Sequence, residues 1–178
     1  MATHTIIPEK ERIPSEAVEA PILPEGTYFS EVAETLIDEA IGLVRMHVPA
    51  LGAVSHQPTL VARPDFAGPF KCALAIRVAR VLGAQCAGVC SVYHYDQEAA
   101  VLRLVVLCSN PKEENFEFVR RLDRALLDQL QTLRVREFLG AASVLDVLAL
   151  TPKDVRLGIG GAGLLGAVRN APVQIWTR

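Results

Sequence analysis

The sequence predicts an α/β (α+β) fold in which a small, mostly antiparallel sheet is flanked by helices. Three observations support this prediction. Apolar residues recur at helical spacing over residues 30–48 and 113–139. Two strand-like segments, residues 86–95 and 101–108, follow one another across a short polar turn. Apolar residues make up 51% of the 178 positions, which is enough for the core of one domain.

The N-terminal segment differs in composition from the rest of the chain. Residues 1–26 contain Pro8, Pro14, Pro21 and Pro24 among glutamates and aliphatic residues. Proline lacks a backbone N–H and breaks helices, so we interpret this segment as a flexible Pro/Glu-rich arm. Residues 27–178 are then predicted to form a single α/β domain.

Two helices are expected before the first strand. The first covers residues 30–48, with Ser30 as its N-cap. The second covers residues 69–82, because Pro69 suits the first position of a helix and Gly83 follows as the residue that ends it.

A hairpin is expected next. Residues 86–95 are interpreted as a buried strand and residues 101–108 as the strand that returns beside it. Side chains alternate between the two faces of a strand, so Tyr93 and Tyr95 share one face and His94 lies on the other.

Helix-start signals occur twice in the second half of the chain. Asn110-Pro-Lys-Glu113 combines a capping residue with proline at the first helical position. It predicts a helix that runs to Leu139 and ends at Gly140. Thr151-Pro-Lys-Asp154 repeats the capping pattern. Between the two signals we expect a short helix near residues 143–150.

Two segments of the chain match parts of one known domain type. Residues 73–107 read as an amphipathic helix, a strand, an acidic turn and a second strand. Residues 158–176 read as a glycine-rich loop, a short helix and the start of a strand, residues 172–177, that we expect at a sheet edge. In this order they resemble a GAF domain. A full GAF domain continues after this last strand, so the resemblance implies either a degenerate version or a sheet that a partner completes.

The glycine-rich loop allows more than one interpretation. Gly161-Ala-Gly163-Leu-Leu-Gly166 matches the dinucleotide pattern G-x-G-x-x-G, but only twelve residues follow it. A dinucleotide site needs a second strand and an acidic residue about 20 positions further on, so this function is disfavoured. The loop could bind an anion between Arg156 and Arg169. Alternatively, its glycines only permit a tight turn and close packing.

The resemblance also implies a ligand pocket on the sheet, where GAF domains bind small molecules. Tyr93 and Tyr95 would line this pocket. The alternative is that they are half-buried aromatic residues at the end of a strand, and the sequence leaves both interpretations open. The candidate ligand-binding residues are therefore Tyr93, Tyr95, Arg156, Gly161, Gly163 and Arg169. The sequence identifies no cofactor.

The cysteines do not form a recognisable site. Cys86, Cys90 and His94 are spaced four residues apart, which is about 13 Å on an extended strand and too far to share a metal ion. We therefore expect core cysteines, and the absence of CxxC spacing predicts reduced thiols in the cytoplasm. Some GAF-fold enzymes reduce free methionine sulfoxide with paired cysteines at and beyond the glycine loop. This chain has no cysteine after Cys108.

Charge and hydropathy narrow the choice of partners. The net charge is −2 and the isoelectric point is near 6.1, so no nucleic-acid partner is expected. Residues 1–40 carry nine acids and two bases, whereas residues 41–178 carry eleven acids and sixteen bases. No run of 18 apolar residues occurs, so no membrane span is expected. The helical stripes repeat closer to 3.6 than 3.5 residues, which favours an intramolecular core and leaves a homodimer as the alternative.

These observations favour a non-catalytic sensory or regulatory module that binds a small ligand or a protein partner. No nucleophile, base and orienting group occur at a spacing that would form a catalytic site. A scaffold subunit without a ligand is the first alternative. A cysteine-based redox enzyme of the free methionine sulfoxide reductase type is the second.

Overall fold

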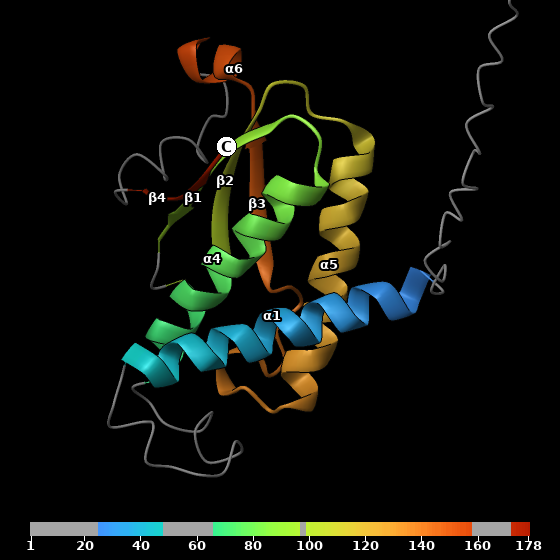
Figure 1. Ribbon diagram of the computed structural model, residues 1–178, viewed down its shortest axis with the longest axis vertical. Helices are drawn as coiled ribbons and strands as arrows, with labels where there is room; N and C mark the ends of the chain where they lie inside the picture. Colours follow the sequence, from blue (N-terminus) through green and yellow to red (C-terminus); the bar gives the residue numbers. More distant parts are fainter. Residues whose placement is uncertain (1–24, 48–65, 97–98, 158–171) are drawn as a thin grey trace, which may run out of the picture.

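The computed structural model describes residues 25–47, 66–96, 99–157 and 172–178. Its sheet has four strands in the order β3-β2-β1-β4. The strand β1 pairs antiparallel with β2 and β4, whereas β2 and β3 are parallel. The fold is therefore α+β with a mixed sheet (Figure 1). The strands are β1 (Val89–Tyr95), β2 (Leu102–Cys108), β3 (Leu145–Leu150) and β4 (Val173–Thr177).

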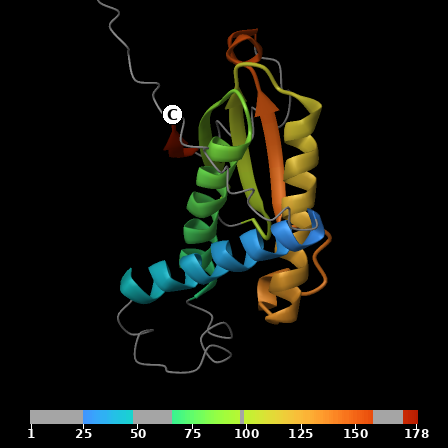
Figure 2. The same cartoon turned by 45° about the vertical axis from the view of Figure 1, so that its right-hand side comes forward.

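In the described part of the chain, three long helices pack on one face of this sheet in two layers. The helix α4 (Ala67–Gln85) lies over the strands, α5 (Glu113–Thr132) runs alongside β3, and α1 (Glu25–His47) crosses the outer side of both helices (Figures 1 and 2). The main core lies between these layers. Its largest fully buried side chains include those of Ile37, Phe70, Leu74, Leu104, Leu126 and Phe138.

The first helix is confirmed, but it begins earlier than predicted. It starts at Glu25, so Ser30 lies within it and is not its N-cap. The Ser30 hydroxyl instead donates a hydrogen bond of 3.1 Å to the carbonyl oxygen of Gly26, four residues earlier. The predicted arm, apart from Glu25 and Gly26, lies outside the described residues.

The second helix continues past Gly83, where the sequence predicted its end. It ends at Gln85, and Gly83 is buried beneath the indole ring of Trp176 on β4. A Cβ atom at position 83 would overlap three atoms of this ring. Glycine at this position therefore permits close packing of α4 against β4, and it does not end the helix.

The first strand begins three residues later than predicted. Gly88 has a φ of +82° in the turn between α4 and β1, so the strand starts at Val89. The pairing register with β2 then shifts between Val89 and Ser91. This irregularity places Val89 in the main core together with Val92, although strict alternation would put them on opposite faces.

The third long helix ends at Thr132 and does not reach Leu139 as predicted. Arg134 adopts a φ of +53°, and its N–H donates to the carbonyl oxygen of Gln131 at 3.0 Å. The N–H of Val135 donates to the carbonyl oxygen of Leu130, also at 3.0 Å. These two bonds form a Schellman motif, which ends the helix although arginine occupies the position where glycine is usual.

The prediction of a helix at residues 143–150 is wrong, because this segment forms the edge strand β3 beside β2. Asp123 on α5 accepts hydrogen bonds of 2.7 Å from the N–H groups of Val144 and Leu145. A carboxylate on a distant helix therefore helps to position the start of the strand. The other edge strand, β4, confirms the prediction for residues 172–177.

The opposite face of the sheet carries a smaller apolar cluster. Tyr95, Val105 and Leu150 are buried there, and Tyr93, Leu107 and Leu148 pack against them. A short helix, α6 (Pro152–Leu157), follows β3. It begins with the predicted capping pair, in which the Thr151 hydroxyl accepts from the Asp154 N–H at 3.1 Å and the Asp154 carboxylate accepts from the Thr151 N–H at 2.9 Å.

Candidate binding groove between α1 and α5

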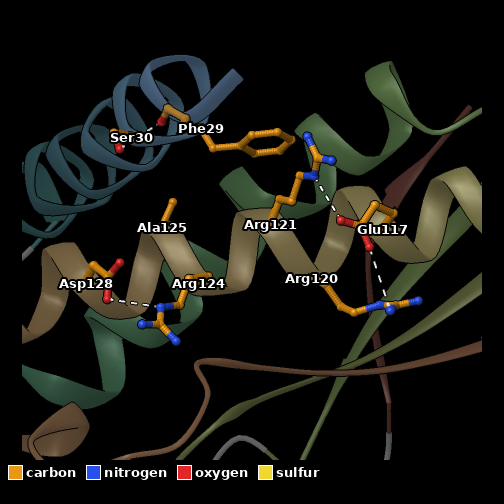
Figure 3. A pocket seen from close by; sticks show the side chains of 9 residues that line it. Phe29, Ser30, Glu117, Arg120, Arg121, Arg124, Ala125 and Asp128 are labelled. Atoms are coloured by element: carbon orange, nitrogen blue, oxygen red, sulfur yellow. Dashed lines mark hydrogen bonds and ion pairs between the residues drawn. The ribbon is translucent and has the colours of Figure 1, made fainter. Parts of the chain in front are cut away.

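A surface groove lies where the first turns of α1 meet the middle of α5. Its cavity volume is about 530 Å³. In Figure 3, Phe29 projects from α1 towards Arg121, and the charged side chains follow one another along α5. The groove, which we call the α1–α5 groove, is lined by Gly26, Phe29, Ser30, Glu117, Arg120, Arg121, Arg124, Ala125 and Asp128.

The sequence of α5 explains why charges gather here. Leu122, Leu126 and Leu130 recur at helical spacing and are buried in the core, so the opposite side of the helix, which carries Arg120, Arg124 and Asp128, faces outward. Acids and bases three or four positions apart on the outward side lie close enough to pair. The helix thus presents a charged side to solvent along the groove.

Ion pairs form a ladder along this side of α5. Glu117 receives a hydrogen bond of 2.9 Å from Arg121 Nε and lies 3.7 Å from Arg120 Nη1. Arg120 also donates to Glu113 at 2.8 Å, and Arg124 Nε lies 3.4 Å from Asp128. Each guanidinium has five N–H donors, so these contacts leave donors for a bound anion on Arg120 and Arg124.

An aromatic side chain closes the groove on the α1 side. The ring centroids of Phe29 and Phe118 lie 5.3 Å apart. The guanidinium carbon of Arg121 lies 6.0 Å from the Phe29 centroid, within cation–π range. The groove therefore combines an apolar wall with guanidinium groups.

The charges of the groove are nearly balanced, with a small positive excess. Three arginines and two acids line it, which gives a net charge of +1. The hydrogen bond and positive charge of Arg121 lower the pKa of Glu117, and the charge of Arg120 adds to this effect. Glu117 is therefore a carboxylate at neutral pH, and it is a poor proton donor.

The lining residues suit binding better than catalysis. Among the described residues that line the groove, the only hydroxyl belongs to Ser30, which donates within α1, and none is a histidine or a cysteine. Guanidinium groups bind carboxylates and phosphates through paired N–H donors. Across the part of the chain that the structure describes, no group of three or more His, Cys, Asp or Glu side chains could hold a metal ion.

The predicted ligand-binding residues that the structure describes do not line this groove. Tyr93 and Tyr95 are on the far face of the sheet, and Tyr95 is only 6% exposed because it packs in the smaller cluster. His94 is on the opposite face, as alternation predicted, and it is buried. Arg156 is exposed on α6. Gly161, Gly163 and Arg169 lie outside the described residues.

Cys86 and Cys108 are buried in the core, whereas Cys72 and Cys90 are half-buried. Burial raises the pKa of Cys86 to about 11, and the neighbouring Cys108 contributes to this rise. Burial also raises the pKa of Cys108. Thiolates are the reactive form of cysteine, so neither thiol is activated for redox chemistry at neutral pH.

A buried pair of basic residues lies between the sheet and α4. His94 on β1 is 2% exposed and Lys71 on α4 is 8% exposed. The ammonium group of Lys71 donates a hydrogen bond of 2.8 Å to the carbonyl oxygen of Ala99. Burial lowers the pKa of His94, and the charge of Lys71 lowers it further.

The α1–α5 groove was not predicted from the sequence, because only the apolar stripe of the helix α5 entered the prediction. The signal was present in the run from Glu113 to Asp128, where acids and arginines alternate at spacings of three and four. What the sequence did not provide was the position of α1. Only the crossing of α1 over α5 brings Phe29 beside Arg121.

The fold and the groove define a small α+β protein with a charged surface site. Comparisons with known protein families, curated proteins and solved structures find no match. Among the described residues, no helix is both long and apolar enough to span a membrane.

Proposed function

We propose that this protein is a non-catalytic regulatory module that binds an acidic, extended segment of a protein partner in the α1–α5 groove. The observation that carries this proposal is the row of Arg120, Arg121 and Arg124 on α5, next to the half-buried aromatic ring of Phe29. Such a surface suits a peptide in which carboxylates alternate with aliphatic side chains.

The exposure of the groove favours a protein segment over a small ligand. The side chains of Arg120 and Arg124 are 64% and 78% exposed. Small molecules are usually bound in concave sites that cover about 70–90% of their surface. An open groove cannot provide this coverage, whereas an extended peptide can bind along a helix and form many weak contacts.

Binding of an acidic peptide provides a direct test. The probe is a fluorescein-labelled octaglutamate peptide, followed by fluorescence anisotropy with the full-length protein. We expect saturable binding whose Kd increases with NaCl concentration, because exposed charges are screened by salt. The double variant Arg120→Gln/Arg124→Gln should raise the Kd roughly three- to tenfold, since each exposed charge contact contributes modestly.

A matched control distinguishes binding of the peptide in the groove from nonspecific attraction to positive charges elsewhere on the protein. Arg136→Gln removes an exposed arginine outside the groove, on the short 3-10 helix Arg136–Phe138. This variant should bind octaglutamate as the wild type does. The absence of saturable binding, or equal weakening by Arg136→Gln and by the groove variant, would contradict the proposed function. Circular dichroism verifies that the variants are folded.

A further inference from the structure

We propose that residues 1–24, the part of the arm that precedes α1, occupy the α1–α5 groove of their own chain and compete with the partner for it. This inference rests on the proposed function, because it assigns an intramolecular occupant to the same groove. In this arrangement the arm inhibits binding within its own chain, and an acidic partner must displace the arm before the partner can bind the groove. Three features of the chain support this inference.

The first feature is charge complementarity. This part of the arm contains Glu9, Glu11, Glu16 and Glu19 but only two basic residues, Lys10 and Arg12, which gives it a net side-chain charge of −2. The groove has a net charge of +1, from three arginines and two acids. Opposite charges on the arm and the groove favour their association over that of unrelated surfaces.

The second feature is proximity along the chain. The arm joins α1 at Glu25, and the next residue, Gly26, lines the groove. Six residue steps separate Glu19 from Glu25, and an extended chain of this length spans up to about 20 Å. Glu16 and Glu19 can therefore reach the arginines of α5. A short tether also gives a local concentration on the order of millimolar, so weak contacts are enough.

The third feature is the charge of the neighbouring cavities. The cavity between α1 and α4 is lined by Glu31, Glu39, Arg77 and Arg80, which sum to zero. The cavity beside the start of α5 is lined by Glu113, Glu114, Glu117 and Arg121, which sum to −2. Of these three cavities along α1, the α1–α5 groove is the one whose lining side chains carry a positive net charge, although it shares Glu117 and Arg121 with the cavity beside the start of α5.

Limited trypsin digestion of the full-length chain tests where the arm lies. Trypsin cleaves after Lys10 and Arg12, so a bound arm is protected and its release is measured by mass spectrometry. We expect Arg120→Gln/Arg124→Gln to speed cleavage after Arg12 roughly two- to tenfold, and 0.5 M NaCl to do the same for the wild type. Arg136→Gln is the control and should leave the cleavage rate unchanged. Equal rates in all three proteins would overturn the proposal.

Two further outcomes identify the occupant. If the arm of a second copy binds the groove, protection will decrease on dilution, whereas intramolecular binding does not depend on protein concentration. Neutralising the arm with Glu16→Gln/Glu19→Gln should lower the Kd for octaglutamate roughly two- to tenfold, because the competitor is weakened. A Kd equal to that of the wild type would overturn autoinhibition.

The same experiments separate failure of this inference from failure of the proposed function. Octaglutamate that binds wild type and Glu16→Gln/Glu19→Gln equally well leaves the groove as a binding site and removes the arm as its occupant. Octaglutamate that binds neither protein removes the proposed function. The trypsin assay then shows, in the absence of any partner, whether contacts with Arg120 and Arg124 protect the arm from cleavage.

Discussion

At the scale of single residues, the contact between Gly83 and Trp176 shows how one missing side chain shapes the packing. The indole ring occupies the space that a Cβ atom at position 83 would need. The ring joins the edge strand β4 to α4, and Arg178 Nη2 adds a hydrogen bond of 3.3 Å to the carbonyl oxygen of Gly83. The position of β4 therefore depends on glycine within a helix.

We expect Gly83→Ala to destabilise the protein. In an exposed helix this change adds about 1 kcal/mol of stability, but here the added methyl displaces Trp176, and overpacking costs about 1–3 kcal/mol. Urea unfolding followed by fluorescence measures the effect, because Trp176 is the single tryptophan of the chain. Gly42→Ala on α1 is the matched control, since a methyl group there would meet no side chain within 4 Å. Stabilisation by both substitutions would show that Trp176 does not pack over Gly83.

At the scale of elements, the end of α5 is set by backbone geometry more than by residue type. Arg134 adopts a positive φ of 53° in the Schellman motif. This conformation costs a non-glycine residue about 1 kcal/mol, and glycine adopts it without strain. The helix ends there because Val135 and Phe138 are buried in the core, which requires the chain to turn back.

Arg134→Gly should therefore stabilise the protein by about 0.5–1 kcal/mol. Its side chain is exposed, so the substitution removes few contacts. The midpoint of urea unfolding should increase with an unchanged slope. As a comparison, Thr132→Gly at the last helical position should destabilise by about 0.5–1 kcal/mol, because glycine there increases the entropy of the unfolded chain and the hydrogen bond from the Thr132 hydroxyl to the Asp128 carbonyl oxygen is lost. A lower midpoint for Arg134→Gly would exclude the left-handed conformation at this position.

At the scale of the whole molecule, α4 and the sheet enclose the pair of Lys71 and His94. Burial and the charge of Lys71 keep the pKa of His94 below its ordinary value of 6.5. Above pH 6.5 the imidazole is neutral in both folded and unfolded states. Between pH 6.5 and the lower folded pKa, the unfolded chain binds a proton that the folded protein does not. Stability therefore decreases as the pH falls through this window.

We expect the free energy of unfolding to decrease from pH 7 to pH 5.5, by at most about 1.4 kcal/mol per pH unit from this one group. Urea unfolding at a series of pH values measures the slope. His94→Gln should flatten it, and Lys71→Met should reduce it because the positive charge that lowers the pKa of His94 is removed. Equal slopes in the wild type and His94→Gln would assign the pH dependence to other groups.

Local patterns in the sequence were sufficient for several elements. Apolar periodicity predicted the helices α1 and α5, and alternation placed Tyr93 and Tyr95 opposite His94. The capping pair Thr151 and Asp154 was also predicted, because such signals depend only on near neighbours. Capping and periodicity signals connect residues three or four positions apart, so they can be recognised in the sequence alone.

The misassigned elements depend on contacts between distant residues. The segment from Leu145 to Leu150 becomes a strand because β2 provides its hydrogen-bonding partner and Asp123 binds the backbone at its start. The helix α4 continues through Gly83 because Trp176, 93 positions later, covers it. Neither partner can be recognised from the local sequence, since both are brought in by the fold.

Residue types and their spacing along the sequence are enough to give the apolar stripes of α1 and α5, the charged outer side of α5 and the acidity of the arm. Each follows from residue type and helical spacing, which are properties of a continuous segment. The tertiary structure decided the mixed sheet and the α1–α5 groove. The groove exists because α1 crosses α5 and places Phe29 beside Arg121, and a crossing of two helices is set by how their apolar faces pack, which no single segment encodes.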